Sequence, residues 1–352
     1  MVFFLAAVPV AAVDFNDEVG TELWMIQTSG SSTDLGEGEG FFGNPPGGPY
    51  TDGTTTIQLG VWGLLGLVPP DGGLTEDPYV QNLTIGILGS DILLDWESTL
   101  SNGPFYVWRR VGGFENAPDN WVPAAGSPVD TTSFTDPGQV GVGAEEEQVY
   151  YRVISSSSQA ALNYKVAVGK VNHTFGQGNN YFNCPFVITG TLSNVIGAGA
   201  GSIPKNCQVL DHDRATDGFI SSLYDGLAWQ DPYALALGKS YVFFNNDSDP
   251  LVLTMVGAVN PDPASFSKTL AVGNTYFGLP FPLSKSLDSL FGANPIMNDN
   301  VLIHDRTTDG FVAQPCNTDG AFAEPAFELT PATGYVYYRN SGQFDWQPRP
   351  EY

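Results

Sequence analysis

One ten-residue stretch occurs twice in this chain and constrains its fold more than any other feature. Residues 210–219 read LDHDRATDGF and residues 302–311 read LIHDRTTDGF, so eight of the ten positions are identical. A match this close, at an offset of 92 residues, indicates a duplicated structural unit, and such a repeat determines the architecture of the chain that contains it.

The repeated stretch predicts a strand, a tight turn and a second strand. In an extended strand, Leu210, His212 and Arg214 lie on one face, with Asp211 and Asp213 on the other. The Thr-Asp-Gly that follows is typical of a turn, because Asp accepts hydrogen bonds from its own backbone and Gly tolerates positive φ. The motif is therefore better explained by a structural role than by a catalytic or binding role.

The composition favours many short strands. Gly and Pro together number 67 of 352 residues, whereas the hydrophobic fraction, 42%, is ordinary for a folded protein. Only residues 195–200 and 287–291 suggest short helices. We therefore expect an all-β, multi-domain chain of β-sandwiches or barrels.

The net charge of −25 restricts the partners of this protein. Such a surface repels nucleic-acid phosphates and anionic lipids, which argues against nucleic-acid binding and membrane insertion. It suits an extracellular protein, or one that meets divalent cations, although plain solubility also explains it. The first basic side chain is Arg109.

Two of the three cysteines lie in the first copy of the repeat, and the second copy lacks them. Because Cys184 and Cys207 are both present in this copy only, we predict a disulfide between them and an oxidising compartment. The alternative is that both are buried free thiols. Cys316 is left over, either buried or available for a bond between chains.

Residues 1–13 form an apolar segment with small residues at its end. It resembles part of a secretory signal but lacks a basic leader, and it is too short to span a bilayer as a helix. We expect either a signal or a strand that inserts into a neighbouring subunit. The residues expected to insert are Phe3, Phe4, Leu5, Val8 and Val10.

Residues 14–76 read as strands between turns, with strands at 21–27 and 54–62. Residues 34–44 align without a gap with residues 236–246, which suggests a third, partial copy of the repeat.

Four motifs are typical of a sandwich domain within residues 77–157. They are ILLDW at 92–96, FYVWRR at 105–110, SFTDPG at 133–138 and VYYRVIS at 149–155. On these motifs the segment resembles a fibronectin type III domain. The resemblance implies a β-sandwich in which Trp96 packs against Tyr150 or Tyr151, and it implies no catalysis.

Residues 155–158 read as a short hinge, followed by copy one at 164–260 and copy two at 265–352. Successive aromatic residues at 241–244 and 335–338 predict strands that are covered on both faces. Tandem units after a fibronectin-like domain resemble those of secreted bacterial surface proteins.

His212 and His304 are the first candidates for chemistry, since His, Asp and Arg recur together. The alternative is that Arg214 and Arg306 pair with carboxylates while the histidines fill a half-buried face. Because a duplicated strand-and-turn context favours packing, we predict no catalytic residue, no bound cofactor and no enzyme.

Calcium is the one metal for which the sequence offers oxygen ligands in loops. Three loops qualify, although turn-forming side chains explain them equally well: residues 247–249, residues 298–300 and the turn with Asp213 and Asp217. Three tryptophans could stack on sugars, although core positions are more common for this residue: Trp121, Trp229 and Trp346.

Together these features predict a structural subunit of an extracellular filament or surface layer. Its partners would be copies of itself in a homopolymer, joined head to tail by β-strand complementation. The alternatives are a carbohydrate-binding or adhesive module of the cell surface that contacts a glycan, and a secreted hydrolase.

Overall fold

The computed structural model describes residues 77–348 and four short strands before residue 58. Short gaps in that range fall at 78, 115–117, 142–146, 164–165, 189–190, 193–195, 198–202, 231–232, 262–264, 319, 324 and 326. The chain divides into two compact units, residues 1–69 and 70–352. No helix in the described residues has the length and hydrophobicity to cross a membrane.

The first unit contains two short antiparallel pairs. They are β1 (Leu5–Ala7) with β2 (Ile26–Thr28) and β3 (Tyr50–Thr51) with β4 (Thr56–Ile57). The predicted strands at 21–27 and 54–62 overlap β2 and β4. The described residues do not include positions 34–44, nor the predicted inserting side chains Phe3, Phe4, Leu5, Val8 and Val10, although the backbone of Leu5 belongs to β1.

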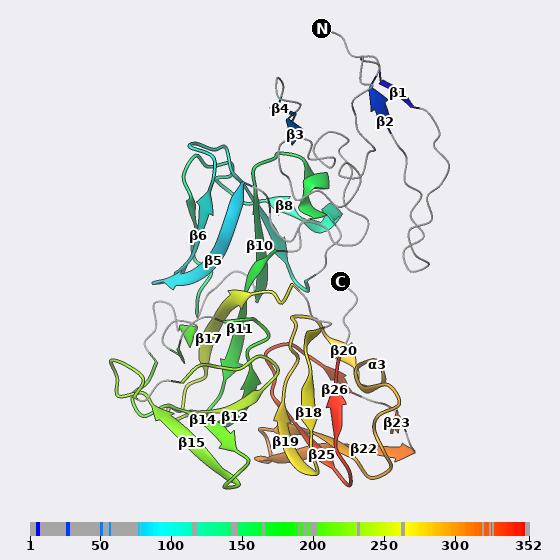
Figure 1. Ribbon diagram of the computed structural model, residues 1–352. Coiled ribbons are helices and arrows are strands. Elements are labelled where there is room, and N and C mark those ends of the chain that lie inside the picture. The colour runs from blue at the N-terminus through cyan, green and yellow to red at the C-terminus, as the bar shows by residue number, and fades with distance from the viewer. Residues whose placement is uncertain are drawn as a thin grey trace. The chain divides into compact units, whose positions relative to one another are not determined.

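The second unit is built from antiparallel sheets, which confirms the all-β fold class (Figure 1). The predicted helix at 287–291 is present as α3 (Leu287–Phe291). The prediction for residues 195–200 is wrong, because this stretch contains β13 (Ile196–Gly197), which is paired to a longer strand.

Residues 77–154 form a β-sandwich-like pair of sheets. One sheet is β5 (Val80–Leu88), β6 (Asp91–Ser98) and β9 (Ser133–Asp136); facing it are β7 (Tyr106–Val111), β8 (Val122–Pro123) and β10 (Gln148–Ile154). Trp96 and Tyr151 share the core between the sheets, whereas Tyr150 belongs to the core on the other side. Asp136 links the sheets by accepting hydrogen bonds from Tyr151 Oη (2.6 Å) and Arg109 Nε (3.1 Å).

The larger sheet continues past the predicted hinge at 155–158. Its order is β13-β17-β11-β10-β7-β8, in which β11 (Val168–Phe175) pairs with β10 and β17 (Leu251–Ala258) pairs with β11. Val168 and Val256, at the start of copy one and near its end, complete the core of the sandwich. One sheet thus runs through the sandwich and copy one (Figure 1).

Strand β10 is buried on both faces, with every residue from 149 to 154 at most 5% exposed. On its second face, Tyr150 packs over Gly169, where a Cβ atom would come within 2.5 Å of the tyrosine ring. The strand at 241–244 is largely buried on both faces, as predicted, whereas in the strand at 335–338 Tyr338 is 40% exposed.

The two repeats share one strand order, so the predicted duplication is confirmed. Copy one is β12 (Gly178–Asn183), β16 (Ser240–Asn245), β14 (Gln208–Asp213) and β15 (Gly218–Leu223), in that order across the sheet. Copy two is β19 (Gly273–Phe277), β25 (Tyr335–Arg339), β21 (Asn300–Asp305), β22 (Gly310–Thr318) and the added β23 (Ala321–Phe322).

Short strand pairs complete copy two. They are β18 (Lys268–Leu270) with β26 (Phe344–Trp346) and β20 (Lys285–Ser286) with β24 (Glu328–Leu329). The pair β18–β26 repeats the place of β11–β17 in copy one.

The repeated motif forms the predicted hairpin in both copies, β14–β15 and β21–β22. The prediction that glycine takes the positive φ is wrong. Asp217 and Asp309 each have φ 50°, a region that Asp tolerates because its short polar side chain bonds locally. Asp213 Oδ1 caps the turn by accepting from the backbone N–H of Ala215 at 3.0 Å.

Candidate functional site at the interface between the repeats

The histidines of the two motifs pack against the opposite repeat. The His212 ring of copy one stacks on Tyr276 of copy two, with ring centroids 4.3 Å apart. In return, the His304 ring of copy two lies 4.9 Å from Tyr181 of copy one. Between them, Tyr181 and Tyr276 are stacked at 6.1 Å with an interplanar angle of 16°.

These contacts are reciprocal, as in a two-fold symmetric dimer. Phe219 and Phe311 repeat the pattern, with ring centroids 5.9 Å from Tyr276 and 5.2 Å from Tyr181 respectively. The hairpin face that carries His and Phe in each repeat therefore packs against the other repeat, and the two faces form an aromatic interface between the repeats. Edge-on and stacked aromatic pairs each stabilise such a contact by about 0.5–1.5 kcal/mol.

The interpretation of the motif histidines as packed side chains is confirmed. Their side chains are only 8% and 6% exposed. His212 Nε2 lies 3.2 Å from Asp217 Oδ1, and His304 Nε2 lies 3.1 Å from Asp309 Oδ1. Each imidazole therefore has one nitrogen fixed by the turn of its own hairpin.

The expected pairing of the motif arginines with carboxylates is wrong. Arg214 instead donates to backbone and hydroxyl oxygens of copy two: Val272 O at 2.5 Å, Asn274 O at 3.1 Å and Thr275 Oγ1 at 3.0 Å. These acceptors precede or start β19, and they become available because the repeats face each other.

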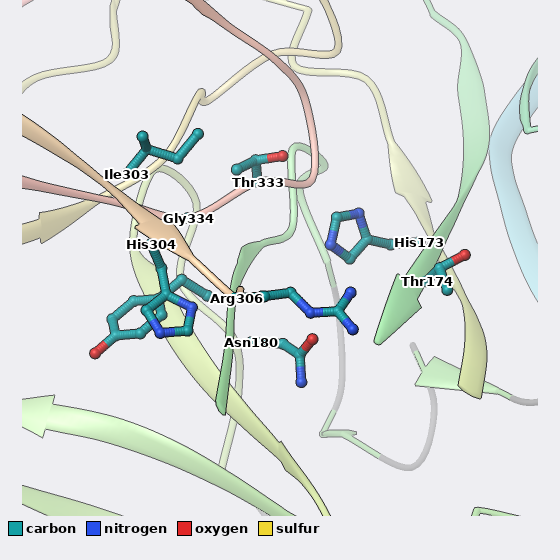
Figure 2. A pocket seen from close by; sticks show the side chains of 9 residues that line it. His173, Thr174, Asn180, Ile303, His304, Arg306, Thr333 and Gly334 are labelled. Carbon is teal, nitrogen blue, oxygen red and sulfur yellow. The ribbon is translucent and has the colours of Figure 1, made fainter. Parts of the chain in front are cut away.

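Arg306, the counterpart of Arg214, lies instead in a cavity of about 170 Å³ (Figure 2). The guanidinium is directed toward His173 and Asn180, with the His304 ring beside the arginine side chain. Burial, followed by the charge of Arg306, lowers the pKa of His173 to about 4, so this imidazole is neutral at pH 7. The cavity is lined by His173, Thr174, Asn180, Tyr181, Ile303, His304, Arg306, Thr333 and Gly334.

The sequence gives no local signal for this cavity. His173 lies in β11 and Arg306 follows β21, and only the reciprocal packing of the repeats brings them together. A second cavity, of about 320 Å³, includes Glu147 and Pro282 in its lining and contains no other charged residue.

The three loops considered for calcium use their acidic side chains within the protein. Asp213 caps its turn and Asp217 pairs with His212. Asp247 Oδ1 accepts from the backbone N–H of Asp249 at 3.3 Å, and Asp299 is buried against Arg339. Among the residues described, no three His, Cys, Asp or Glu side chains gather as a metal site.

The tryptophans considered for sugar stacking belong to the core. Trp121, Trp229 and Trp346 are 1%, 5% and 0% exposed. The idea that they form a binding platform is wrong, because burial removes the ring faces from any ligand. Arg152 occupies the face of Trp121 at 4.6 Å, which uses that ring in a cation–π contact.

All three cysteines are free and buried in this structure. The predicted disulfide between Cys184 and Cys207 is not formed here, and the two are separate thiols in the core of copy one. Burial raises the pKa of Cys184 to about 12 and also raises the pKa of Cys207. The Cys207 Sγ lies 3.7 Å from Asn245 Oδ1.

Copy two replaces that neutral pair with a buried ion pair. Asp299 stands at the position of Cys207, and Arg339 at the position of Asn245. Asp299 Oδ2 accepts from Arg339 Nη1 at 2.5 Å and from Tyr337 Oη at 2.8 Å. Its carboxylate also accepts from the backbone N–H groups of Ile296 and Asn340, at 3.0 and 2.9 Å.

No family model, curated protein or solved structure matches this chain.

Proposed function

We propose that the protein is a structural subunit of an extracellular filament or surface layer, assembled by β-strand addition between copies. The observation that carries this proposal is the free edge of β15 (Gly218–Leu223). It is the last strand of its sheet and has no second neighbour among the described strands, although Gln230 covers its C-terminal end by donating to Leu223 O at 2.7 Å. An unpaired edge presents backbone N–H and C=O groups that another chain can extend.

The β15 edge lacks the features that usually prevent edge-to-edge pairing. Its sequence, GFISSL, has no charged residue and no proline. Phe219 and Ile220 are 46% and 55% exposed. The equivalent edge in copy two is better protected, since β22 contains Pro315 and an irregular register where β23 pairs with it. Copy one therefore offers the better acceptor.

The donor in this proposal is the apolar segment 1–13 of the next copy. Main-chain hydrogen bonds supply the affinity, and alternate side chains fit the exposed positions of the edge. A donor at one end and an acceptor elsewhere on the same chain make a head-to-tail contact that does not close, which produces a fibre. The sandwich at 77–157, with its resemblance to fibronectin type III, acts as a spacer.

The experiment is negative-stain microscopy of the full chain, of residues 14–352 and of the Ile220→Lys variant. We expect filaments from the full chain but not from residues 14–352 or from Ile220→Lys, since a lysine on the edge disfavours pairing, and the control variant should form filaments as the full chain does. Leu227→Lys is the matched control, because Leu227 is 92% exposed and lies in the turn after β15. Filaments in all four samples would refute strand addition, and none in any would refute the structural role.

A further inference from the structure

Arg306 and Arg214 occupy the same place in the two motifs, yet only Arg214 is bonded. Within the described part of the chain, no hydrogen bond or ion pair fixes the Arg306 guanidinium, whereas Arg214 makes three hydrogen bonds. The two-fold relation between the repeats is therefore broken at this residue.

Two sequence differences between the repeats accompany this change, Asn180 in place of Thr275 and Gly176 in place of Ala271. Thr275, which accepts from Arg214, corresponds to Asn180 in copy one. The Asn180 side chain is already used, since its Oδ1 accepts from Gly176 N at 3.0 Å and its Nδ2 donates to three backbone oxygens. Arg306 occupies the space where a Cβ atom at position 176 would lie, a space that the Cβ of Ala271 fills in copy two.

A second polar group in the same cavity also lacks a partner. His304 Nδ1 is buried and has no hydrogen-bond partner among the described residues, and the side chain is 6% exposed. In the tautomer that donates from Nε2 to Asp309, Nδ1 carries no proton and is an acceptor. The cavity thus contains a charged donor, the Arg306 guanidinium, and one acceptor, His304 Nδ1.

The charge and size of the cavity define the ligand. No acidic residue lines it, and with His173 neutral the net charge of the lining is that of one guanidinium. One positive charge matches a carboxylate better than a phosphate dianion, and the planar fork fits a carboxylate in a bidentate manner. Arg306 and Thr174 are exposed, so the cavity opens to solvent.

We propose that this cavity binds a small hydroxycarboxylate of the sugar-acid class. The carboxylate pairs with Arg306, and a ligand hydroxyl donates to His304 Nδ1. The volume of about 170 Å³ accommodates a ligand up to one sugar ring in size. This binding does not depend on assembly, so a soluble subunit tests it separately from filament formation.

The test measures binding of glucuronate, acetate and glucose to the full-length Ile220→Lys chain, which is expected to stay unassembled, by NMR of the histidine ring nitrogens. The protein has three histidines, so each can be followed. We expect saturable shifts at His173 and His304 but not at His212, with glucuronate bound more tightly than acetate and glucose not bound. The carboxylate should also raise the pKa of His173 from about 4.

Variants at the two motif arginines separate this site from a general anion effect. Arg306→Gln should weaken glucuronate binding at least about tenfold, since a charge-assisted bidentate contact is lost. Arg306→Lys keeps the charge and should retain part of the binding. Arg214→Gln is the matched control and should bind as the unmodified protein does. Equal affinity for glucose or unchanged binding by Arg306→Gln would overturn the proposal. So would no binding at about 10 mM glucuronate, ten times a dissociation constant of about 1 mM.

Discussion

The buried ion pair of copy two gives the sharpest test of how this fold is stabilised. Asp299 is fully buried, and its carboxylate accepts four hydrogen bonds, one of them from the Arg339 guanidinium. Asp299→Asn removes the negative charge that pairs with Arg339. It also places an amide N–H group, which is a donor, opposite groups that themselves donate. Removing one partner of a buried pair costs about 3–5 kcal/mol, and we expect a loss of about 4 kcal/mol in the free energy of unfolding.

Copy one indicates how this loss can be repaired. At the corresponding positions it has Cys207, Phe243 and Asn245, and Pro204, which has no N–H, stands in place of Ile296. The triple variant Asp299→Cys, Tyr337→Phe, Arg339→Asn introduces the neutral set into copy two. In this variant the backbone N–H of Ile296 loses its acceptor, and copy one offers no replacement for it. We therefore expect the free energy of unfolding to fall by about 1–3 kcal/mol, less than in the single variant.

Urea unfolding followed by tryptophan fluorescence measures these differences. Asp217→Asn is the control, since its carboxylate is 92% exposed and surface pairs contribute little. Its effect should stay within about 0.5 kcal/mol. A loss below about 1 kcal/mol for Asp299→Asn, or a triple variant as unstable as the single one, would refute the reasoning.

Three further predictions follow from the interface and the core. Arg214→Gln should lower the free energy of unfolding by about 1–2 kcal/mol, whereas Arg306→Gln should change it by less than about 0.5 kcal/mol, both measured in urea. Because the folded-state pKa of His173 lies below its unfolded value, the unfolded state binds more protons between pH 6.5 and 4. Stability should therefore fall as the pH falls through that range, and His173→Gln should flatten the decline in thermal unfolding at successive pH values. All three thiols should react with Ellman's reagent only after unfolding, and a count of one instead of three would indicate a Cys184–Cys207 disulfide.

The features that the sequence predicted well are local ones. The hairpins at 210–219 and 302–311 follow from alternation and turn residues that lie within ten positions of each other. Burial of β16 on both faces follows from the successive aromatic and apolar residues at 241–244. The positive φ at Asp217 was misassigned because Asp and Gly both tolerate that region and stand side by side.

The features that the sequence did not predict depend on contacts between distant segments. An apolar strand covered on both faces does not reveal its neighbours, so the addition of β11 and β17 to the sandwich sheet was missed. The stacking of Tyr181 on Tyr276 requires both repeats to be placed face to face. The different environments of Arg214 and Arg306 involve a Thr-to-Asn and an Ala-to-Gly difference whose effects appear only in that arrangement.

The sheet that runs through the sandwich and copy one also affects synthesis of the chain. Val256 in β17 completes the core around Trp96, and about a hundred residues separate it from the end of β10. At roughly 5–20 residues per second, a ribosome needs about 5–20 s to add that length. During this interval β11 has no strand on its outer side, because its neighbour there is β17, and part of the apolar core is exposed. The emerging chain is therefore expected to depend on chaperones until copy one is complete.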